Sequence, residues 1–375
     1  MSSMQKVAMR NRTTPSAPLS PAAPLSPAPS GAASPAARSI LSLLALVAVA
    51  LGLTTVALGV AACGSSSGGK QLTLVAYSTP QGAYASLIPA FQATSEGKGV
   101  TFSQSYGPSG DQSRAVAAGL KADVVNFSLE PDVTRLVKAG LVSSTWNQNA
   151  THGFVTESVA VIIVRKGNPK HITGWSDLVK PGVDVITPNP STSGSARWNI
   201  LAAYGAELKE GKMPSQAMAY LRTLLIKNVS VQDTSGSAAM QTFAGGKGDV
   251  LISYESEAIA AEQKGIPIQY IVPKQTILIQ TPIAVTSGSS HATQAQAFVN
   301  WLWSPAAQTI WAKKGYRPVV PSVAKQFASE FPTPARLFTI SSLGGWTKID
   351  KSLFAPGTGS VTKIEQAAGV PTASS

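Results

Sequence analysis

The chain has 375 residues, of which 30 are basic and 18 acidic, so its formal net charge at pH 7 is +12. The basic residues are spread along the chain, and this argues against a nucleic-acid-binding protein, which would gather Lys and Arg on one element. Cys63 is the only cysteine, so the chain forms no internal disulfide, and a domain of this length can bury a core without one.

Residues 1–62 have the composition of a bacterial export signal. A basic region precedes an apolar stretch from Ile40 to Ala62, which ends in two alanines directly before Cys63. A charged region, an apolar region and small residues before the cleavage site are typical of secretion signals. Cleavage there would make Cys63 the new N-terminus, with a thiol free for lipid attachment. We expect a lipid on Cys63, a flexible Ser/Gly tether over residues 63–70, and a protein held on the outer face of the cytoplasmic membrane.

An uncleaved transmembrane anchor is the alternative interpretation of the apolar stretch, because about 20 apolar residues can span a bilayer. The Ala-Ala-Cys ending and the Ser/Gly tether that follows it favour the lipoprotein.

After the tether, short apolar strand-like runs alternate with segments of helical spacing. Strands are expected at residues 72–77, 100–105, 123–127, 158–165, 183–187, 229–232, 249–253 and 277–285. Helices are expected at residues 83–94, 111–120, 195–208, 238–244, 292–303 and 305–314. This alternation predicts an α/β protein with a mostly parallel sheet. Residues 357–375 carry no such pattern and are expected to form a loosely ordered tail.

Three Ser/Gly turns, at residues 107–110, 191–195 and 234–237, lie between a predicted strand and a predicted helix. The first N–H groups of a helix have no intrahelical partner, and they carry partial positive charge. Several such helix starts that point at one spot form an anion site without any Lys or Arg. The simpler alternative is that Ser and Gly only cap these helices.

The second of these turns belongs to a longer motif, Thr-Pro-Asn-Pro at residues 187–190 followed by Ser-Gly-Ser-Ala-Arg-Trp-Asn at residues 193–199. This motif closely resembles the signature of the bacterial sulfate/thiosulfate-binding proteins of ABC importers. The segments 164–170, 248–252 and 314–318 resemble the same family. The resemblance extends from about residue 71 to 356.

The resemblance implies an α/β, two-lobed periplasmic-binding-protein fold of type II, with the ligand in the cleft between the lobes. Lobe I would comprise residues 71–158 and 281–356, and lobe II residues 159–280. It further implies a monomeric solute-binding protein that takes up sulfate or thiosulfate and hands it to membrane permease subunits with a cytoplasmic ATPase. No cofactor, metal, nucleic acid or enzymatic activity is implied.

The resemblance also implies which residues hold the anion, through backbone N–H groups, one serine hydroxyl and one aromatic side chain. These residues are Ser78, Ser109, Ser193, Gly194, Ser195, Gly236 and Tyr254. The hydroxyl donor falls on Ser193 and the aromatic donor on Tyr254. Because no titrating group is among them, sulfate affinity is expected to stay nearly constant from about pH 5 to 8.

Four positions depart from the family pattern. Tyr254 stands where Trp is common, Ser78 where Asp is usual, and Asp111 and Ser237 where a basic residue is common. These departures bear on affinity and anion choice rather than on the fold. Arg197, one turn into the helix after the signature, is expected to pair with a carboxylate and brace the turn.

Other functions stay open at this point. Molybdate, tungstate and phosphate are also tetrahedral oxyanions. An enzyme acting on sulfate or phosphate esters would need a metal cluster or an activated nucleophile, but the three histidines are far apart, and neither Ser109 nor Ser193 stands in a G-x-S-x-G motif. Residues 64–70 spell the start of a phosphate loop, but Gln71 stands where that loop has Ser or Thr.

Overall fold

The structure is a computed structural model that describes residues 70–372. The expected export signal and the lipid site at Cys63 lie outside the described residues, as does the tether apart from its last residue. Within residues 70–372, no helix combines the length and apolar character needed to cross a membrane.

The strands form one mixed sheet in the order β2-β1-β3-β9-β4-β7-β5-β6, with β8 paired to β4 and β10 paired to β9. The strands are β1 (Lys70–Tyr77), β2 (Val100–Gly107), β3 (Val124–Asn126), β4 (Phe154–Arg165), β5 (Val185–Pro188), β6 (Val229–Asp233), β7 (Val250–Tyr254), β8 (Ile268–Ile271), β9 (Gln275–Val285) and β10 (Arg336–Phe338).

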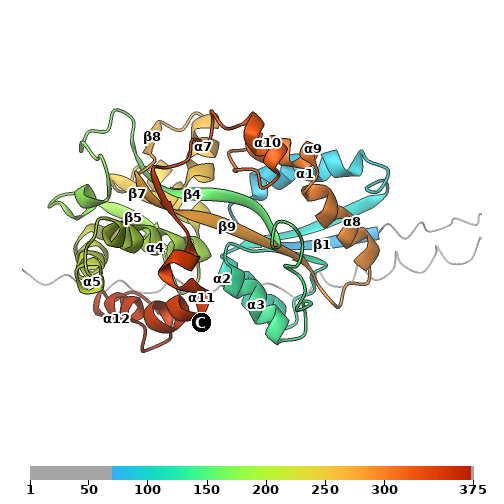
Figure 1. Cartoon of the computed structure of the whole chain (residues 1–375), viewed down its shortest axis with the longest axis horizontal. Coiled ribbons are helices and arrows are strands. Elements are labelled where there is room, and N and C mark those ends of the chain that lie inside the picture. Colours follow the sequence, from blue (N-terminus) through green and yellow to red (C-terminus); the bar gives the residue numbers. More distant parts are fainter. Residues whose placement is uncertain (1–69, 373–375) are drawn as a thin grey trace, which may run out of the picture. The chain divides into compact units, whose positions relative to one another are not determined.

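Two long antiparallel strands, β4 and β9, join the two halves of this sheet (Figure 1). At one end β9 pairs with β3. β3 pairs in parallel with β1, which pairs in parallel with β2. Farther along, β4 pairs with β7, which is followed by the parallel strands β5 and β6. We call the β1–β3 side lobe I and the β5–β8 side lobe II. The mostly parallel pairing that the sequence predicts therefore holds among β1–β3 and β5–β7, whereas the crossing strands are antiparallel to β3, β7 and β8.

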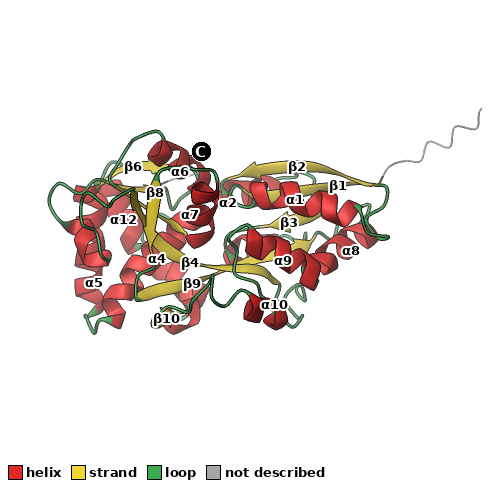
Figure 2. Cartoon of the chain, turned by 90° about the horizontal axis from the view of Figure 1, so that it is seen from above, coloured by secondary structure: helices red, strands yellow, loops and turns green. Residues whose placement is uncertain are grey.

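Helices cover the sheet in each lobe (Figure 2). Lobe I carries α1 (Gln81–Gln92), α2 (Ser109–Ala117), α3 (Glu130–Lys138), α8 (Ala292–Leu302), α9 (Pro305–Lys313) and α10 (Pro321–Gln326). Lobe II carries α4 (Gly194–Lys209), α5 (Pro214–Thr223), α6 (Gly236–Ala244), α7 (Glu255–Gln263), α11 (Gly345–Ile349) and α12 (Ser360–Ala367). Short 3₁₀ turns occupy Trp175–Val179 and Ile340–Leu343, and π-helical turns occupy Leu224–Asn228 and Asp350–Phe354.

Each lobe has its own apolar core. In lobe I, Tyr84 and Trp311 pack edge to face with ring centroids 5.3 Å apart, and Phe91 and Phe298 pack beside them at 5.0 Å. Aromatic pairs of this kind add to the stabilisation that burial of their apolar surface provides. The two-lobed α/β fold is thereby confirmed, with separate cores on either side of the crossing strands.

The C-terminal segment differs from the sequence-based expectation. Residues 360–367, within the range 357–375 that the sequence predicts to be loosely ordered, instead form α12, whose Val361 and Ile364 are buried in the lobe II core. Val361 and Ile364 are three residues apart, so they fall on one helix face, a spacing that is easily missed in a single short helix.

The last part of the range expected for lobe I also packs elsewhere. Trp346 lies edge to face against Trp198 with ring centroids 4.8 Å apart, and the Phe338 ring lies against Gly205 of α4. A Cβ atom at Gly205 would come within 2.3 Å of that ring, so only glycine permits the contact. Residues 336–356 thus belong to the core of lobe II rather than to lobe I.

Glu365 on α12 makes the stability of this C-terminal packing dependent on pH. Its side chain is buried, one oxygen accepts a hydrogen bond from Gln232 at 2.7 Å, and the other has no partner within residues 70–372. Burial raises the pKa of Glu365 to about 7 from its ordinary 4.5. The folded protein therefore binds the proton of Glu365 more tightly than the unfolded chain does. The stabilisation that this proton provides is complete below pH 4.5 and is lost as the pH rises through 7.

We therefore expect Glu365→Gln to increase the free energy of unfolding at pH 8 by about 3 kcal/mol and so to raise the melting temperature. At pH 4.5 the substitution should change the melting temperature little. Thermal unfolding at both pH values measures the difference. The exposed Glu330→Gln serves as the control and should leave both values unchanged. An equal shift for Glu365→Gln at the two pH values would contradict the expectation.

Candidate anion-binding site

A small cavity lies between the lobes, where the end of β1 meets the N-termini of α2, α4 and α6. Its lining residues are Tyr77, Ser78, Thr79, Pro108, Ser109, Ser128, Ser193, Gly194, Ser195, Ser235 and Gly236. The structure thus brings together six of the seven expected site residues from four separate segments. Tyr254 is the exception, because it does not line the cavity.

The N-terminus of α4 supplies unpaired donors from lobe II. Ser193 precedes the helix and donates its own N–H to Asn189 at 2.9 Å, which fixes the turn. The N–H groups of Gly194 and Ser195 lie in the first helical turn, where no preceding helical carbonyl is available. The hydroxyl groups of Ser193 and Ser195 lie 2.8 Å apart, so one of them can donate to the other while that one donates into the cavity.

The N-terminus of α6 adds a second helix start from lobe II. The Ser235 hydroxyl accepts a hydrogen bond from Ala238 N–H at 3.2 Å, so this side chain caps the helix. The N–H of Gly236, the first residue of α6, remains free of an intrahelical partner. Capping by the Ser235 side chain therefore leaves the Gly236 N–H available to a ligand, because the two groups of this turn are different.

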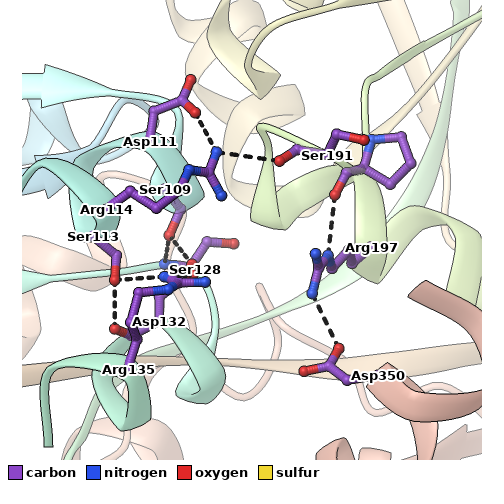
Figure 3. Close-up of polar contacts among 11 residues, drawn as sticks. Ser109, Asp111, Ser113, Arg114, Ser128, Asp132, Arg135, Ser191, Arg197 and Asp350 are labelled. Carbon is purple, nitrogen blue, oxygen red and sulfur yellow. Dashed lines mark hydrogen bonds and ion pairs between the residues drawn. The ribbon is translucent and has the colours of Figure 1, made fainter. Parts of the chain in front are cut away.

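The N-terminus of α2 is the contribution of lobe I, and a hydrogen-bond network holds it in place (Figure 3). The Ser109 hydroxyl donates to Asp132 at 2.7 Å and accepts from Ser128 N–H at 2.9 Å. Arg135 in turn donates to Asp132 at 2.9 Å and to Ser113 at 2.6 Å. Both bonding directions of the Ser109 hydroxyl are thereby used, so the backbone N–H is what Ser109 offers to a ligand.

Tyr254 reaches the cavity indirectly. Its side chain is fully buried, and its hydroxyl lies 2.6 Å from that of Ser128, which lines the cavity. Burial raises the pKa of the Tyr254 hydroxyl well above its ordinary value, so the group stays neutral. Sequence reasoning missed Ser128, because a serine between β3 and α3 carries no helix-start signal of its own.

The two lobes are closed on each other around the cavity. Trp198 donates its indole N–H to the carbonyl of Ser128 at 2.8 Å, and Gly110 N–H donates to the carbonyl of Thr192 at 3.0 Å. Arg114 donates across the same gap to the carbonyl of Ser191 at 3.2 Å (Figure 3). Three bonds from lobe I to the turn and helix of the signature thus hold the closed arrangement.

Comparison with known proteins identifies the family. Residues 72–317 match the protein family described as "Bacterial extracellular solute-binding protein". The chain is 42% identical to a sulfate-binding protein of Synechococcus elongatus, over 86% of this chain and 96% of that protein. It is 35% identical to a thiosulfate-binding protein of Pseudomonas aeruginosa, over 80% of this chain and 94% of that protein. In structure it resembles the sulfate-binding protein SubI from Mycobacterium tuberculosis H37Rv, with a TM-score of 0.74 and 49% identity over 76% of this chain and 99% of that one.

The chain belongs to the sulfate/thiosulfate-binding family of bacterial solute-binding proteins. Two of its departures from the family pattern acquire a structural context. Asp111, which by itself would repel an anion, forms an ion pair with Arg114. Ser237 lines an outer groove between α1 and α6 rather than the cavity itself.

Arg197 behaves as the sequence predicts for this family member. It pairs with Asp350 at 3.0 Å (Figure 3). Its guanidinium also lies over the ring of Phe354. It also donates to the carbonyl of Pro190, at 3.0 Å, and so braces the signature turn against the C-terminal segment. Burial raises the pKa of Asp350, while the adjacent Arg197 opposes that shift.

One titratable group near the cavity was not foreseen. Glu257 of α7 is buried, and its carboxylate accepts hydrogen bonds from Thr79 at 3.2 Å and from Ser253 at 2.5 Å. Thr79 belongs to lobe I, whereas Ser253 and Glu257 belong to lobe II. Burial raises the pKa of Glu257 above its ordinary value. Within residues 70–372, no group of three or more His, Cys, Asp and Glu side chains is placed to hold a metal ion.

Gly194 allows the lobes to close. A Cβ atom at this position would lie 2.7 Å from the Ser128 hydroxyl and 2.8 Å from the Leu129 side chain, both in lobe I. We expect Gly194→Ala to hold the cleft open, so that sulfate affinity falls at least tenfold while the melting temperature without sulfate stays within a few degrees.

Calorimetric titration with sulfate and thermal unfolding test this expectation together. Gly82→Ala is the matched control, because Gly82 lies at the cleft rim on α1 with no atom within 4 Å of the added carbon. If Gly194→Ala binds sulfate with wild-type affinity, closure of the cleft does not require glycine at this position.

Proposed function

We propose that the protein binds sulfate, or the closely similar thiosulfate, in the cavity between its lobes and delivers it to an ABC importer. The observation that carries the proposal is the convergence of three helix N-termini from two lobes on one cavity. Its family membership supports the same ligand, because its relatives are named for sulfate and thiosulfate. The permease subunits and their cytoplasmic ATPase are the partners proposed for the closed, loaded form.

The chemistry of the lining favours an anion without a proton. The groups described above as free to bind are N–H and O–H donors, and no carboxylate is among the lining residues. Sulfate accepts hydrogen bonds on all four oxygens, whereas monohydrogen phosphate must also donate one. A donor-only cavity would leave that proton unpaired at a cost of about 1–3 kcal/mol, so phosphate should bind poorly.

Molybdate and tungstate remain alternative ligands, because both are tetrahedral dianions that accept hydrogen bonds in the same way. Their larger size would have to be accommodated in a small closed cavity. A hydrolase acting on sulfate or phosphate esters is the remote alternative. We propose a binding protein without enzymatic activity, since the serines of the cavity bond to one another, to Asp132 and to Tyr254, and none bonds to a histidine within the described residues.

The first test concerns the donors. Ser193→Ala removes a hydroxyl at the start of α4, and hydrogen bonds to charged groups are worth about 1.5–3 kcal/mol. We expect sulfate affinity to fall roughly 10- to 150-fold, as measured by isothermal titration calorimetry. Thiosulfate, molybdate and phosphate are titrated in the same series to rank the anions. The exposed Ser341→Ala is the control, and a Ser193→Ala protein with unchanged affinity would remove Ser193 from the ligand shell.

Tyr254→Phe tests the aromatic position in the same assay. If the Tyr254 hydroxyl donates to Ser128, which in turn faces the anion, its loss should weaken sulfate binding at least severalfold. A dissociation constant within twofold of the wild type would show that the Tyr254 hydroxyl serves packing alone.

We also propose that the protein is a monomer anchored by lipid at Cys63 on the outer face of the cytoplasmic membrane. Cys63→Ala should leave the precursor uncut or release the protein from the membrane fraction, because the thiol is the attachment site. Membrane fractionation and intact-mass measurement give the result. A mutant with the mass shift and membrane association of the wild type would refute lipidation at Cys63.

A further inference from the structure

A cavity of about 420 Å³ lies where lobe I meets the C-terminal segment of lobe II, outside the proposed anion site. We call it the outer cavity. Pro190 and Ser191 of the signature turn line it, whereas Ser193 and Gly194 of the same turn line the anion site. The two cavities share no lining residue, so a ligand of the outer cavity would meet a different set of groups.

Cationic side chains from both lobes line the outer cavity. Arg114 of α2 and Arg135 of α3 come from lobe I, and Arg197 of α4 and Lys351 come from lobe II. The Lys351 ammonium forms no ion pair within residues 70–372. Four cations from four separate segments of the chain therefore surround one space.

Carboxylates do not balance this charge inside the outer cavity. Two of the lining residues are acidic, Asp350 and Glu365. Asp350 pairs with one of the arginines at 3.0 Å, and burial raises the pKa of Glu365 to about 7, so much of Glu365 is neutral at neutral pH. Asp111 and Asp132, which pair with the two arginines of lobe I, do not line the cavity. A positive charge therefore remains for a ligand.

Each of the three arginines keeps a terminal nitrogen that donates to no protein group within the described residues. Arg114 makes its protein contacts through Nη2 alone, and Arg135 through Nη1 alone. Arg197 uses Nε and Nη1. The exposed fractions of these side chains are 33%, 34% and 20%, so the guanidinium groups are accessible as well as held in place.

The cations of the two lobes converge. Figure 3 shows Arg114 and Arg135 on one side and Arg197 with Asp350 on the other. Burial raises the pKa of Asp350, and the positive charges of Arg197 and of Arg135 both oppose that shift. Arg135 belongs to lobe I and Asp350 to lobe II, so a negative group placed beside Asp350 is attracted from both lobes.

The remaining walls of the outer cavity indicate the kind of ligand. Phe354, Ala355 and Pro356 give it an apolar side opposite the polar groups of a ligand. A volume of about 420 Å³ falls in the range of about 300–1,000 Å³ that is typical of small-molecule sites. Guanidinium groups match the planar, two-oxygen geometry of carboxylates and phosphates. These features suit a carbon skeleton that carries several anionic groups better than a single inorganic ion.

We propose that the outer cavity is a second binding site, which takes a small organic anion with at least two carboxylate or phosphate groups. Arg114 and Arg135 hold one anionic group from lobe I, and Arg197 and Lys351 hold another from lobe II. Because such a ligand contacts both lobes, its binding stabilises the arrangement of the lobes described above. The site is separate from the proposed sulfate site and does not depend on the function proposed there.

The test is isothermal titration calorimetry of the full protein, loaded with a small excess of sulfate, in HEPES at pH 7. Citrate is the polycarboxylate probe, and phosphoenolpyruvate is the probe that combines a phosphate with a carboxylate. We expect at least one of them to bind at one site per protein. Acetate should bind at least tenfold more weakly, because its single carboxylate can engage the cations of only one lobe.

Two variants assign the bound probe to the outer cavity. Lys351→Glu should weaken its binding on the order of tenfold, because the reversed charge repels the anion. Glu365→Gln keeps the shape of the side chain and removes a carboxylate from the cavity, so at pH 8 it should strengthen binding about threefold or more. Lys363→Glu makes the same charge change as Lys351→Glu at an exposed position of α12 outside the cavity, and it should change affinity less than twofold.

Every outcome decides the proposal. It is overturned if neither citrate nor phosphoenolpyruvate binds, if Lys351→Glu and Lys363→Glu lose affinity equally, or if sulfate displaces the probe, which would then occupy the anion site. If Lys351→Glu does not fold, the affinity of Glu365→Gln at pH 8 decides instead. A protein that binds no sulfate would refute the proposed function, whereas titration of the sulfate-free protein with the same probes would still decide the role of the outer cavity.

Discussion

The anion-binding cavity between the lobes depends on unpaired N–H groups at helix starts, which are held away from water and from any full positive charge. Such groups are costly to bury unless a ligand satisfies them, so they favour the closed state only when an acceptor-rich anion is present. The fold provides these starts in both lobes, with α2 on one side of the cleft and α4 and α6 on the other. Because β4 and β9 are the strands that join the lobes, closure brings the three starts to one cavity.

The charged side chains around the cleft are arranged so that this weak, distributed positive field is preserved. Asp111 pairs with Arg114, Asp132 with Arg135, and Arg197 with Asp350, so each of these three carboxylates has its own cation. These pairs also act mechanically, since Asp132 fixes Ser109 and Arg197 fixes the signature turn. The groups that line the cavity are then backbone dipoles and neutral hydroxyl groups, which do not titrate at neutral pH.

The parts of this site that could be predicted from sequence are local. A helix start after a strand is encoded in a few consecutive residues, so Ser193, Gly194 and Gly236 could be predicted as ligand-binding residues, and they line one cavity in the structure. Ser128 and Glu257 could not be identified, because their positions depend on how β3 and α7 pack, and no local pattern records that. The C-terminal helices could not be predicted for the same reason, because their apolar residues are buried only through packing against the core of lobe II.

Glu257 shows that the charges near a binding cavity extend beyond the residues that line it. The residues that touch the anion determine which hydrogen bonds form, but the free energy of placing a dianion in the cavity includes every charge nearby. The Glu257 carboxylate does not line the cavity, although a Cβ atom on Gly236 would lie 2.9 Å from it. The hydrogen bond from Thr79 to Glu257 also joins the two lobes, so removing the carboxylate to reduce repulsion of the anion would also remove a contact between the lobes.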